Sequence, residues 1–336
     1  MANTTKTNEA AEVLIPTIQD IRGAAARLDG IANLTPLLEN PALNDRLNAR
    51  VLLKAENLQR TGSFKFRGAW NALSLASEDR LKRGVVAWSS GNHAQGVAMA
   101  AAIKNVPATI VMPEDTPAIK IARTRELGAD IVFYDRYTED REAIGRALAA
   151  ERGALLVPSY DDPGVIAGQG TAGLEIVQQC QERNAVPDQV LICCGGGGLS
   201  AGCAIAVHDS FAKASIHVVE PAGFDDTRRS LQAGERLSNG PDARSICDAL
   251  LTTSPGTLTF GLLREHISSG LVVTDDDALS AVDYAMTELK LVVEPGGAVA
   301  LAALLSGKLD VTGQCVVVML SGGNIEFETL QKAMAR

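Results

Sequence analysis

The sequence has little of several features that would assign it to a specialised class of protein. Aromatic residues make up only 4% of its 336 residues, and the six cysteines lack the paired spacing of a zinc site or a disulfide framework. No apolar run reaches the roughly 18 residues that cross a membrane. The first ten residues, MANTTKTNEA, lack the hydrophobic core of a signal peptide. A net charge of −9 argues against binding to nucleic acid or to an anionic membrane. We therefore expect a globular, cytoplasmic protein.

Short β-branched runs that end in glycine or serine alternate with alanine-rich helical stretches. Examples are GVVAW before residues 92–104 and ATIVM before residues 118–127. This alternation is typical of parallel sheets covered by helices on both faces, and such sheets bind ligands at the carboxyl ends of their strands. Residues 84–153 form a compact run of three such units. They predict a small mobile domain inserted into a larger domain made of residues 1–83 and 154–336.

The run SFKFRG at residues 63–68 places Lys65 at the start of a predicted helix. Ser63 is a natural N-cap, so Lys65 falls in the first turn, where the helix dipole disfavours a charged ammonium. A lysine held closer to its neutral amine is a nucleophile suited to forming a Schiff base with an aldehyde. The alternative is a surface lysine just inside a helix, and other parts of the chain must decide between the two.

Four consecutive glycines, Gly195 to Gly198, follow an apolar strand and precede a helix that is predicted to begin near Leu199. Glycines let the backbone curl so that successive N–H groups converge on one anion, assisted by the helix N-terminus. The pattern predicts a phosphate site, and a tight strand-to-helix turn is the alternative. The segment is neither a Walker loop nor a dinucleotide fingerprint.

Two other strand ends carry polar side chains. Ser89, Ser90, Asn92 and His93 combine two hydroxyls, a carboxamide and an imidazole that could bind a carboxylate and a ring oxygen, although a helix cap and turn explains them equally well. Ser321 ends the apolar run CVVVML, where one hydroxyl could donate a hydrogen bond to a ring nitrogen. A turn serine before two glycines is the simpler explanation for Ser321.

Three acidic residues, Glu220, Asp225 and Asp226, follow the predicted strand SIHVV. Carboxylates this close, with backbone carbonyls between them, could bind a hard cation such as Mg²⁺ or Ca²⁺. An aspartate that caps a helix is an equally good explanation.

A Schiff-base lysine, a phosphate site and a serine for a ring nitrogen together indicate pyridoxal 5′-phosphate. At this point the chain resembles the fold-type II pyridoxal-phosphate enzymes of the serine/threonine dehydratase and serine racemase family. The matching motifs occur in family order and span nearly the whole chain: SFKxRG at 63–68, SSGNH at 89–93, AGQGT at 167–171, GGGGL at 195–199 and SGGN at 321–324. The resemblance implies two three-layer α/β/α domains of the tryptophan-synthase-β type, with the cofactor in the cleft between them.

The resemblance also assigns roles to individual residues. Lys65 would carry the cofactor as a Schiff base and act as general base, and Ser90 would be the acid or base on the opposite face of the substrate. Further cofactor contacts are implied for Phe64, Asn92, Gly195, Gly196, Gly197, Gly198, Leu199 and Ser321. Contacts to the substrate carboxylate are implied for Ser89, Ser90, Asn92, His93 and Arg141. A divalent cation (Mg²⁺, Ca²⁺ or Mn²⁺) is implied at Glu220, Asp226 and the carbonyl of Phe224.

These roles imply a dehydratase that removes water from a β-hydroxy-α-amino acid and releases a 2-oxo acid and ammonia. An amino-acid racemase that uses Lys65 and Ser90 on opposite faces is the nearest alternative. A phosphate-binding protein without catalysis is a third, and no G-x-S-x-G motif supports a serine hydrolase. A homodimer is usual for the family.

Two segments depart from the family pattern. Val157-Pro158-Ser159-Tyr160 stands where the family usually has His-Pro-aromatic, and Cys247-Asp248-Ala249 stands where many members have Ala-Asp-Gly. Both lie near the expected position of the substrate side chain. We therefore expect threonine, serine or a substituted analogue such as 3-hydroxyaspartate as the substrate. Only 15 residues follow Ser321, so no regulatory domain of the biosynthetic threonine dehydratases is expected.

Overall fold

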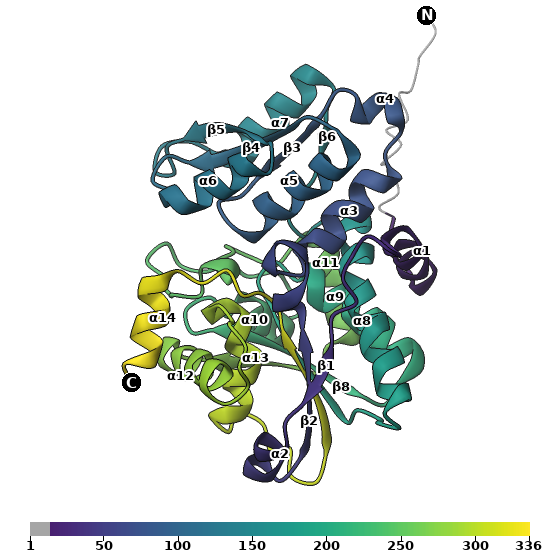
Figure 1. Cartoon of the computed structure of the whole chain (residues 1–336), viewed down its shortest axis with the longest axis vertical. Coiled ribbons are helices and arrows are strands. Elements are labelled where there is room, and N and C mark those ends of the chain that lie inside the picture. The colour runs from purple at the N-terminus through teal and green to yellow at the C-terminus, as the bar shows by residue number, and fades with distance from the viewer. Residues whose placement is uncertain (1–13) are drawn as a thin grey trace, which may run out of the picture.

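Two mainly parallel β-sheets, each with helices on both faces, form the two halves of the molecule (Figure 1). The computed structural model describes residues 14–336; residues 1–13, which the predicted large domain includes, lie outside the described residues. The alternation of apolar strands with alanine-rich helices predicted this architecture. The predicted fold class is confirmed.

The larger sheet has six strands in the order β1-β2-β10-β7-β8-β9, and only the pairing of β1 with β2 is antiparallel. One of its two central strands, β10, has five of its six residues buried, as expected for the apolar run CVVVML. The strands are β1 (Leu37–Glu39), β2 (Arg50–Ala55), β7 (Gln189–Cys193), β8 (Ser215–Pro221), β9 (Ser269–Val273) and β10 (Cys315–Leu320).

The smaller sheet has four parallel strands in the order β5-β4-β3-β6. They are β3 (Val85–Trp88), β4 (Ala108–Pro113), β5 (Asp130–Tyr134) and β6 (Leu155–Leu156). Strand β6 lies just beyond the predicted small domain of residues 84–153, yet it pairs with β3. The domain boundaries themselves stay a prediction.

Helices surround both sheets. In the larger half, α12 and α13 lie on one face of the sheet, and α8 and α9 lie on the other (Figure 1). The α-helices are α1 (Ile18–Leu28), α2 (Pro41–Leu47), α3 (Lys65–Leu75), α4 (Glu78–Leu81), α5 (Asn92–Lys104), α6 (Ala118–Glu126), α7 (Arg141–Arg152), α8 (Pro163–Glu182), α9 (Gly198–Ser210), α10 (Asp226–Ala233), α11 (Thr257–His266), α12 (Asp275–Thr287), α13 (Pro295–Leu305) and α14 (Phe327–Met334). Short 3₁₀ turns occur at η1 (Glu56–Leu58), η2 (Arg60–Gly62) and η3 (Asp248–Leu250).

Glycines let α8 approach its neighbours very closely. A Cβ atom at Gly202 of α9 would stand 2.4 Å from the carbonyl oxygen of Ile166, and one at Gly168 would stand 2.6 Å from the carbonyl oxygen of Arg67 in α3. Any larger residue would push these helices apart. The motif AGQGT therefore has a packing role: it holds α3, which begins with Lys65, against the larger half.

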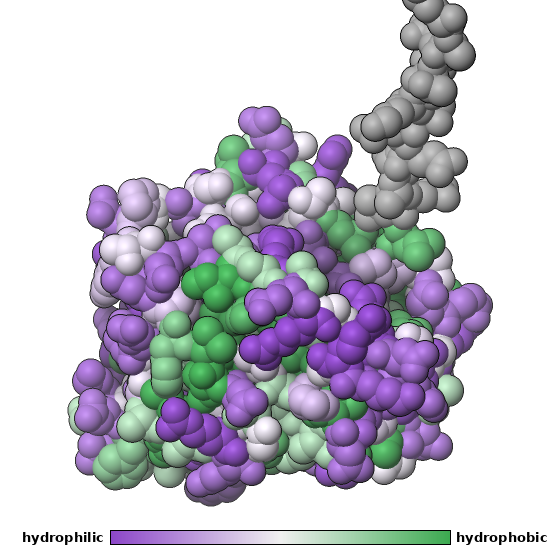
Figure 2. Space-filling view, turned by 90° about the horizontal axis from the view of Figure 1, so that it is seen from above, coloured by the Kyte–Doolittle hydropathy of each residue, from purple (hydrophilic) through white to green (hydrophobic). Residues whose placement is uncertain are grey.

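Figure 2 looks down on the smaller half and shows mostly hydrophilic side chains, with apolar ones gathered near the middle of this face. Among residues 14–336, no helix combines the length and the apolar character needed to span a bilayer.

Candidate active site

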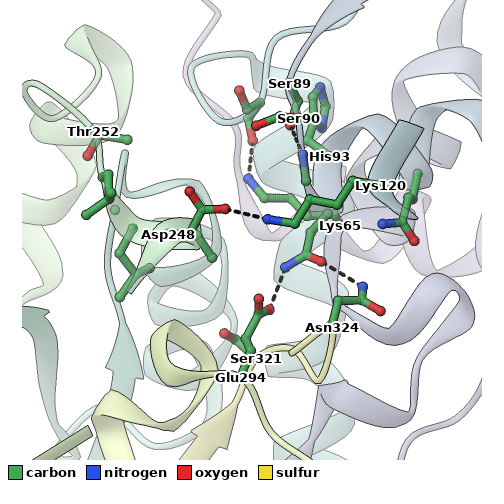
Figure 3. Close-up of a pocket in the computed structure, with 18 of the residues that line it drawn as sticks. Lys65, Ser89, Ser90, His93, Lys120, Asp248, Thr252, Glu294, Ser321 and Asn324 are labelled. Atoms are coloured by element: carbon green, nitrogen blue, oxygen red, sulfur yellow. Dashed lines mark hydrogen bonds and ion pairs between the residues drawn. The ribbon is translucent and has the colours of Figure 1, made fainter. Parts of the chain in front are cut away.

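A cavity of about 900 Å³ opens between the two halves, where the carboxyl ends of strands from both sheets meet. It is lined by all the residues for which a cofactor or substrate contact was predicted: Phe64, Lys65, Ser89, Ser90, Asn92, His93, Arg141, Gly195, Gly196, Gly197, Gly198, Leu199 and Ser321. Figure 3 shows the central side chains turned toward one another. The predicted cation ligands Glu220, Phe224 and Asp226 do not line this cavity.

Lys65 projects from the first position of α3 into the cavity. Its Nζ donates to the carbonyl oxygen of Ser159 at 2.9 Å and lies 5.1 Å from the centre of the Phe64 ring. Burial lowers the pKa of Lys65 to about 8, because a charged ammonium loses its hydration there. A large fraction of the amine is thus neutral near pH 8, which makes it a nucleophile.

Lys65 lies in the first turn of α3 as predicted, but the prediction that Ser63 caps this helix was wrong. Ser63 has extended backbone angles and lies before the helix, and its buried hydroxyl has no hydrogen-bond partner among the described residues. Phe64 is the N-terminal boundary residue of α3, and no side chain caps the helix. Ser63 instead forms a bridge with Gly322, and Phe64 donates its N–H to the carbonyl oxygen of Ser321 at 3.2 Å. Pairing with the end of β10, and not a serine cap, fixes the start of α3.

The glycine loop connects β7 to α9, as predicted. Gly197 has φ +92°, a conformation that glycine adopts without strain, and Gly198 begins the helix. Within residues 14–336, no protein acceptor takes the N–H groups of Gly195, Gly196 or Gly197. Together with the N-terminus of α9, these groups form a cradle that fits a phosphate.

Tyr160 covers one side of this loop and was not predicted as a site residue. A Cβ atom at Gly196 would lie 2.3 Å from Cγ of the Tyr160 ring, so only glycine fits beneath it. The next residue, Asp161, accepts hydrogen bonds from the first N–H groups of α11 and holds the segment in place. The segment VPSY, which departs from the family pattern, thus supplies the Ser159 carbonyl that Lys65 contacts and the Tyr160 ring that packs against the glycine loop. In the sequence, the one indication that this segment belongs to the site was its position shortly before a helix that begins with Pro163.

Ser321 lies at the end of β10 and is almost fully buried. Cys193, at the end of the neighbouring strand β7, lines the same part of the cavity. Burial raises the pKa of the Cys193 thiol to about 11, so it stays neutral at physiological pH. A neutral hydroxyl beside a neutral thiol is a suitable environment for a ring nitrogen that carries no proton.

The side chains of the turn from Ser89 to His93 differ in how they can contribute to the site. The Ser89 hydroxyl accepts the N–H of Gly91 at 3.1 Å, and Ser90 faces the cavity. His93 Nε2 lies 2.8 Å from the carbonyl oxygen of Val157, so this nitrogen carries the proton and donates. Burial lowers the pKa of His93 to about 3, and the ring is neutral. Its free Nδ1 has no hydrogen to offer a carboxylate, so a substrate contact for His93 stays a prediction that this geometry does not support.

Glu294 is a second residue that sequence reasoning missed. Its Oε1 accepts a hydrogen bond from Asn92 Nδ2 at 2.5 Å, and Asn324 Nδ2 donates to Asn92 Oδ1 at 2.7 Å (Figure 3). Burial raises the pKa of Glu294 to about 7. An acidic residue at the end of the apolar run LKLVVE, directly before a proline and a helix, was the available signal.

Cationic side chains from the smaller half face the cavity. Lys120 donates to Asp248 at 3.0 Å and lies 3.2 Å from Glu326, both of the larger half, and these carboxylates raise its pKa against the effect of burial. Arg123 and Arg141 also line the cavity, and neither forms a salt bridge within residues 14–336. The site can therefore accept an anionic ligand through two unpaired guanidinium groups.

Two of the predicted cation residues, Glu220 and Asp226, are buried near one another away from this cavity, and no group of three or more His, Cys, Asp or Glu side chains that could hold a metal ion occurs among residues 14–336. Glu220 accepts the N–H groups of Thr227 and Arg228 at 2.9 and 2.8 Å, so it caps α10, whereas an aspartate had been considered for that role. Asp226 Oδ1 accepts from Asn239, and its buried Oδ2 has no partner among the described residues. Burial raises the pKa of Glu220 to about 8 and that of Asp226 to about 6.

Comparison with known proteins identifies close relatives over almost the whole chain. The L-threo-3-hydroxyaspartate ammonia-lyases of a Pseudomonas species and of Saccharomyces cerevisiae are 46% and 43% identical, over 94% of this chain and 97% and 95% of their own lengths. A serine racemase of Schizosaccharomyces pombe is 36% identical over 94% of this chain and 96% of its own length.

A solved structure has the same fold. The crystal structure of a T.th. threonine deaminase superimposes with a TM-score of 0.87 at 44% identity, covering 93% of this chain and 99% of that one. The family described as pyridoxal-phosphate dependent enzyme matches residues 29–322. With its lysine, glycine loop and serine gathered in one cavity, this chain belongs to the pyridoxal-phosphate dependent enzyme family.

Proposed function

We propose that this protein is an ammonia-lyase that removes water from 3-hydroxyaspartate and releases a 2-oxo acid and ammonia. The observation that carries the proposal is the Lys65 amine, held largely desolvated in a cavity that also contains a phosphate cradle. The identity of 43–46% to two L-threo-3-hydroxyaspartate ammonia-lyases supports this substrate class. Threonine and serine are the simpler members of the same class.

The residues present fit pyridoxal phosphate. Its phosphate would be held by the N–H groups of Gly195 to Leu199, its ring nitrogen by Ser321, its ring oxygen by Asn92 and one face of its ring by Phe64. When bound, the cofactor supplies an aldehyde for Lys65 and an electron sink that acidifies the Cα–H bond of the substrate. The Lys65 amine would serve as the general base that takes the proton from Cα of the substrate.

The walls of the cavity suit a substrate with two carboxylates. The hydroxyls of Ser89 and Ser90 would bind the carboxylate next to Cα. The second carboxylate of 3-hydroxyaspartate would meet Arg141, which lines the cavity without a salt-bridge partner among residues 14–336, with Arg123 near the same opening. A guanidinium group pairs with a carboxylate through two parallel hydrogen bonds, so it favours a dicarboxylate over threonine.

A racemase is the alternative, because Ser90 lines the same cavity as Lys65. A serine hydroxyl on the face opposite the lysine could return a proton to Cα from the other side. The 36% identity to a serine racemase supports keeping this activity in view. Ser90 would then carry racemisation, whereas dehydration needs only Lys65 as the base.

The assay that tests the proposal measures ammonia, 2-oxo acid and the chirality of the remaining amino acid. The protein, supplied with pyridoxal phosphate, is given L-threo-3-hydroxyaspartate, L-threonine and L-serine. We expect equal amounts of ammonia and oxo acid, and the highest kcat/KM for hydroxyaspartate. Lys65→Ala should reduce turnover by about 10³-fold or more, since both the cofactor anchor and the base are lost. An enantiomer that accumulates faster than ammonia would favour the racemase, and turnover of none of the three would refute the proposal.

We further propose that Glu220, Asp226 and the carbonyl of Phe224 bind a divalent cation. Two buried carboxylates with raised pKa values, one with an unpartnered oxygen, fit a hard cation such as Mg²⁺, which would neutralise their charge. Glu220 would use its remaining lone pairs, because its hydrogen bonds to α10 do not exhaust them. The cytoplasmic location and the homodimer stay predictions.

Thermal unfolding with and without Mg²⁺ tests the cation site. At a concentration 100 times the Kd, a cation that binds only the folded protein adds about 2.7 kcal/mol to the free energy of unfolding. Asp226→Asn should remove most of this effect, while Asp209→Asn, an acidic surface position outside the proposed cation site, should keep it. Equal responses of wild type and Asp226→Asn would show that the cation does not bind here.

A further inference from the structure

Two hydrogen bonds hold the carboxamide of Asn92, which lines the cavity, one at its nitrogen and one at its oxygen. Its Nδ2 donates to Glu294 Oε1 at 2.5 Å, and its Oδ1 accepts from Asn324 Nδ2 at 2.7 Å. The three residues come from different parts of the chain: Asn92 begins α5 in the smaller half, Glu294 precedes α13, and Asn324 follows β10. In Figure 3, dashed lines at the labelled Glu294 and Asn324 mark these two hydrogen bonds.

A backbone carbonyl fixes the orientation of this whole row. Asn324 Nδ2 also donates to the carbonyl oxygen of Thr61 at 2.7 Å, and a carbonyl can only accept. The amide nitrogen of Asn324 must therefore lie between Thr61 and Asn92. Its second hydrogen then faces Asn92, whose atom at that contact must be the oxygen. The nitrogen of Asn92 is left to face Glu294, which accepts whether or not its other oxygen carries a proton.

The space for this arrangement depends on Gly322. A Cβ atom at Gly322 would stand 2.1 Å from Glu294 Oε1 and 3.2 Å from Asn92 Nδ2. The backbone N–H of Glu294 donates to the carbonyl oxygen of Gly322 at 3.0 Å, which keeps the two segments together. Glu294 is only 9% exposed, so water does not compete strongly for its carboxylate. The first glycine of the SGGN motif leaves room for a buried acidic partner of Asn92.

We propose that Glu294 and Asn324 are positioning residues that clamp Asn92 with its Nδ2 toward the ring oxygen of the cofactor. The inference rests on the proposed function, because it requires pyridoxal phosphate on Lys65. One N–H of Asn92 is used by Glu294, and the second remains for the ring oxygen. A group that can only donate stabilises the ionised form of that oxygen, which absorbs visible light, over the protonated form, which absorbs in the near ultraviolet.

Reversing both ends of the clamp tests this directly. The double variant Glu294→Gln, Asn324→Asp places a donor where an acceptor stood and an acceptor where a donor stood. The Asn92 carboxamide should then turn by about 180° and present its oxygen to the cofactor. We expect the ratio of near-ultraviolet to visible absorbance of the bound cofactor to rise at least about tenfold, which corresponds to about 1.4 kcal/mol.

Two further variants complete the experiment. Glu78→Gln with Asn40→Asp makes the same chemical changes on the surface, where an aspartate also caps α2, and should keep the wild-type spectrum. Gly322→Ala should push Glu294 away from Asn92 and raise the ratio of near-ultraviolet to visible absorbance, as the double variant does. It replaces the double variant in this test if the double variant does not fold.

A wild-type absorbance ratio in a folded, cofactor-loaded double variant would overturn the clamp, as would an unchanged ratio in Gly322→Ala. A wild-type protein that gains no visible absorbance with pyridoxal phosphate would refute the proposed function instead.

Discussion

Lys65 and Lys120 line the same cavity, but their surroundings give them opposite chemical character. Burial lowers the pKa of Lys65 to about 8, with no carboxylate in hydrogen-bond contact with it among the described residues. Two carboxylates, those of Asp248 and Glu326, raise the pKa of Lys120 and keep it charged. Only the neutral amine attacks an aldehyde, so we expect Lys65 and not Lys120 to be the nucleophile, although both lysines line the cavity.

Arg141 is the residue at which substrate choice can be tested. We expect Arg141→Met to lower kcat/KM for 3-hydroxyaspartate by about 10- to 100-fold, because a hydrogen bond to a charged group contributes roughly 1.5–3 kcal/mol. The values for threonine and serine, which have no second carboxylate, should change by much less. Steady-state kinetics on the three substrates measures this difference.

The matched control for Arg141→Met is Arg146→Met on the same helix. Arg146 is mostly exposed and pairs with Glu142, so its loss should leave all three substrates unaffected. An equal fall of kcat/KM for all three substrates in Arg141→Met would contradict a contact to the second carboxylate.

At the scale of elements, a buried network of charges fixes α3 beneath the site. Arg67, two residues after Lys65, donates to both oxygens of Glu56 at 2.8 and 2.7 Å and to Glu175 of α8 at 2.6 Å. Lys54 of β2, fully buried, donates to Glu175 at 2.5 Å and to the carbonyl oxygen of Thr35 at 2.7 Å. Two positive and two negative charges thus compensate one another, and together they tie β2, α3 and α8 into one unit.

Breaking this network should cost much stability. We expect Arg67→Met to lower the free energy of unfolding by about 3–5 kcal/mol, because Glu56 and Glu175 would lose their main cationic partner while buried or partly buried. Denaturant unfolding of the cofactor-free protein measures the change. Arg22→Met, which breaks the partly exposed pair with Asp209, should cost at most about 1 kcal/mol. Similar losses in the two variants would show that the network is not energetically special.

Sequence patterns predicted the strands of the fold better than the contacts between residues that are distant in the sequence. The β-branched runs before the glycine loop and before Ser321 are strands β7 and β10, because a strand buried on both faces needs such residues. Ser63 was wrongly predicted to cap α3, since its place is set by pairing with Gly322, a residue far away in the sequence. Glu294 was missed for the same reason: its partner Asn92 lies 202 positions earlier, and only the assembled fold brings the two together.

At the scale of the whole molecule, both halves contribute residues to the site. The glycine loop, Ser321 and Glu294 belong to the larger half, while Ser90, Asn92 and Arg141 come from the smaller one. Lys120 bridges the halves through its ion pairs with Asp248 and Glu326, which line the cavity with it. The glycine loop, Ser321, Ser90 and Asn92 lie in motifs that are visible in the sequence. Glu294 and this bridge were not predictable, since their partners lie far away along the chain.

The central claim is that pyridoxal phosphate binds covalently to Lys65. The most direct measurement is to load the protein with pyridoxal phosphate, reduce it with borohydride, digest it and locate the modified lysine by mass spectrometry. We predict one pyridoxyl group, on the peptide that contains Lys65, and none in Lys65→Ala. A protein that takes up no cofactor, or a modification at Lys120 with Lys65 untouched, would contradict the account.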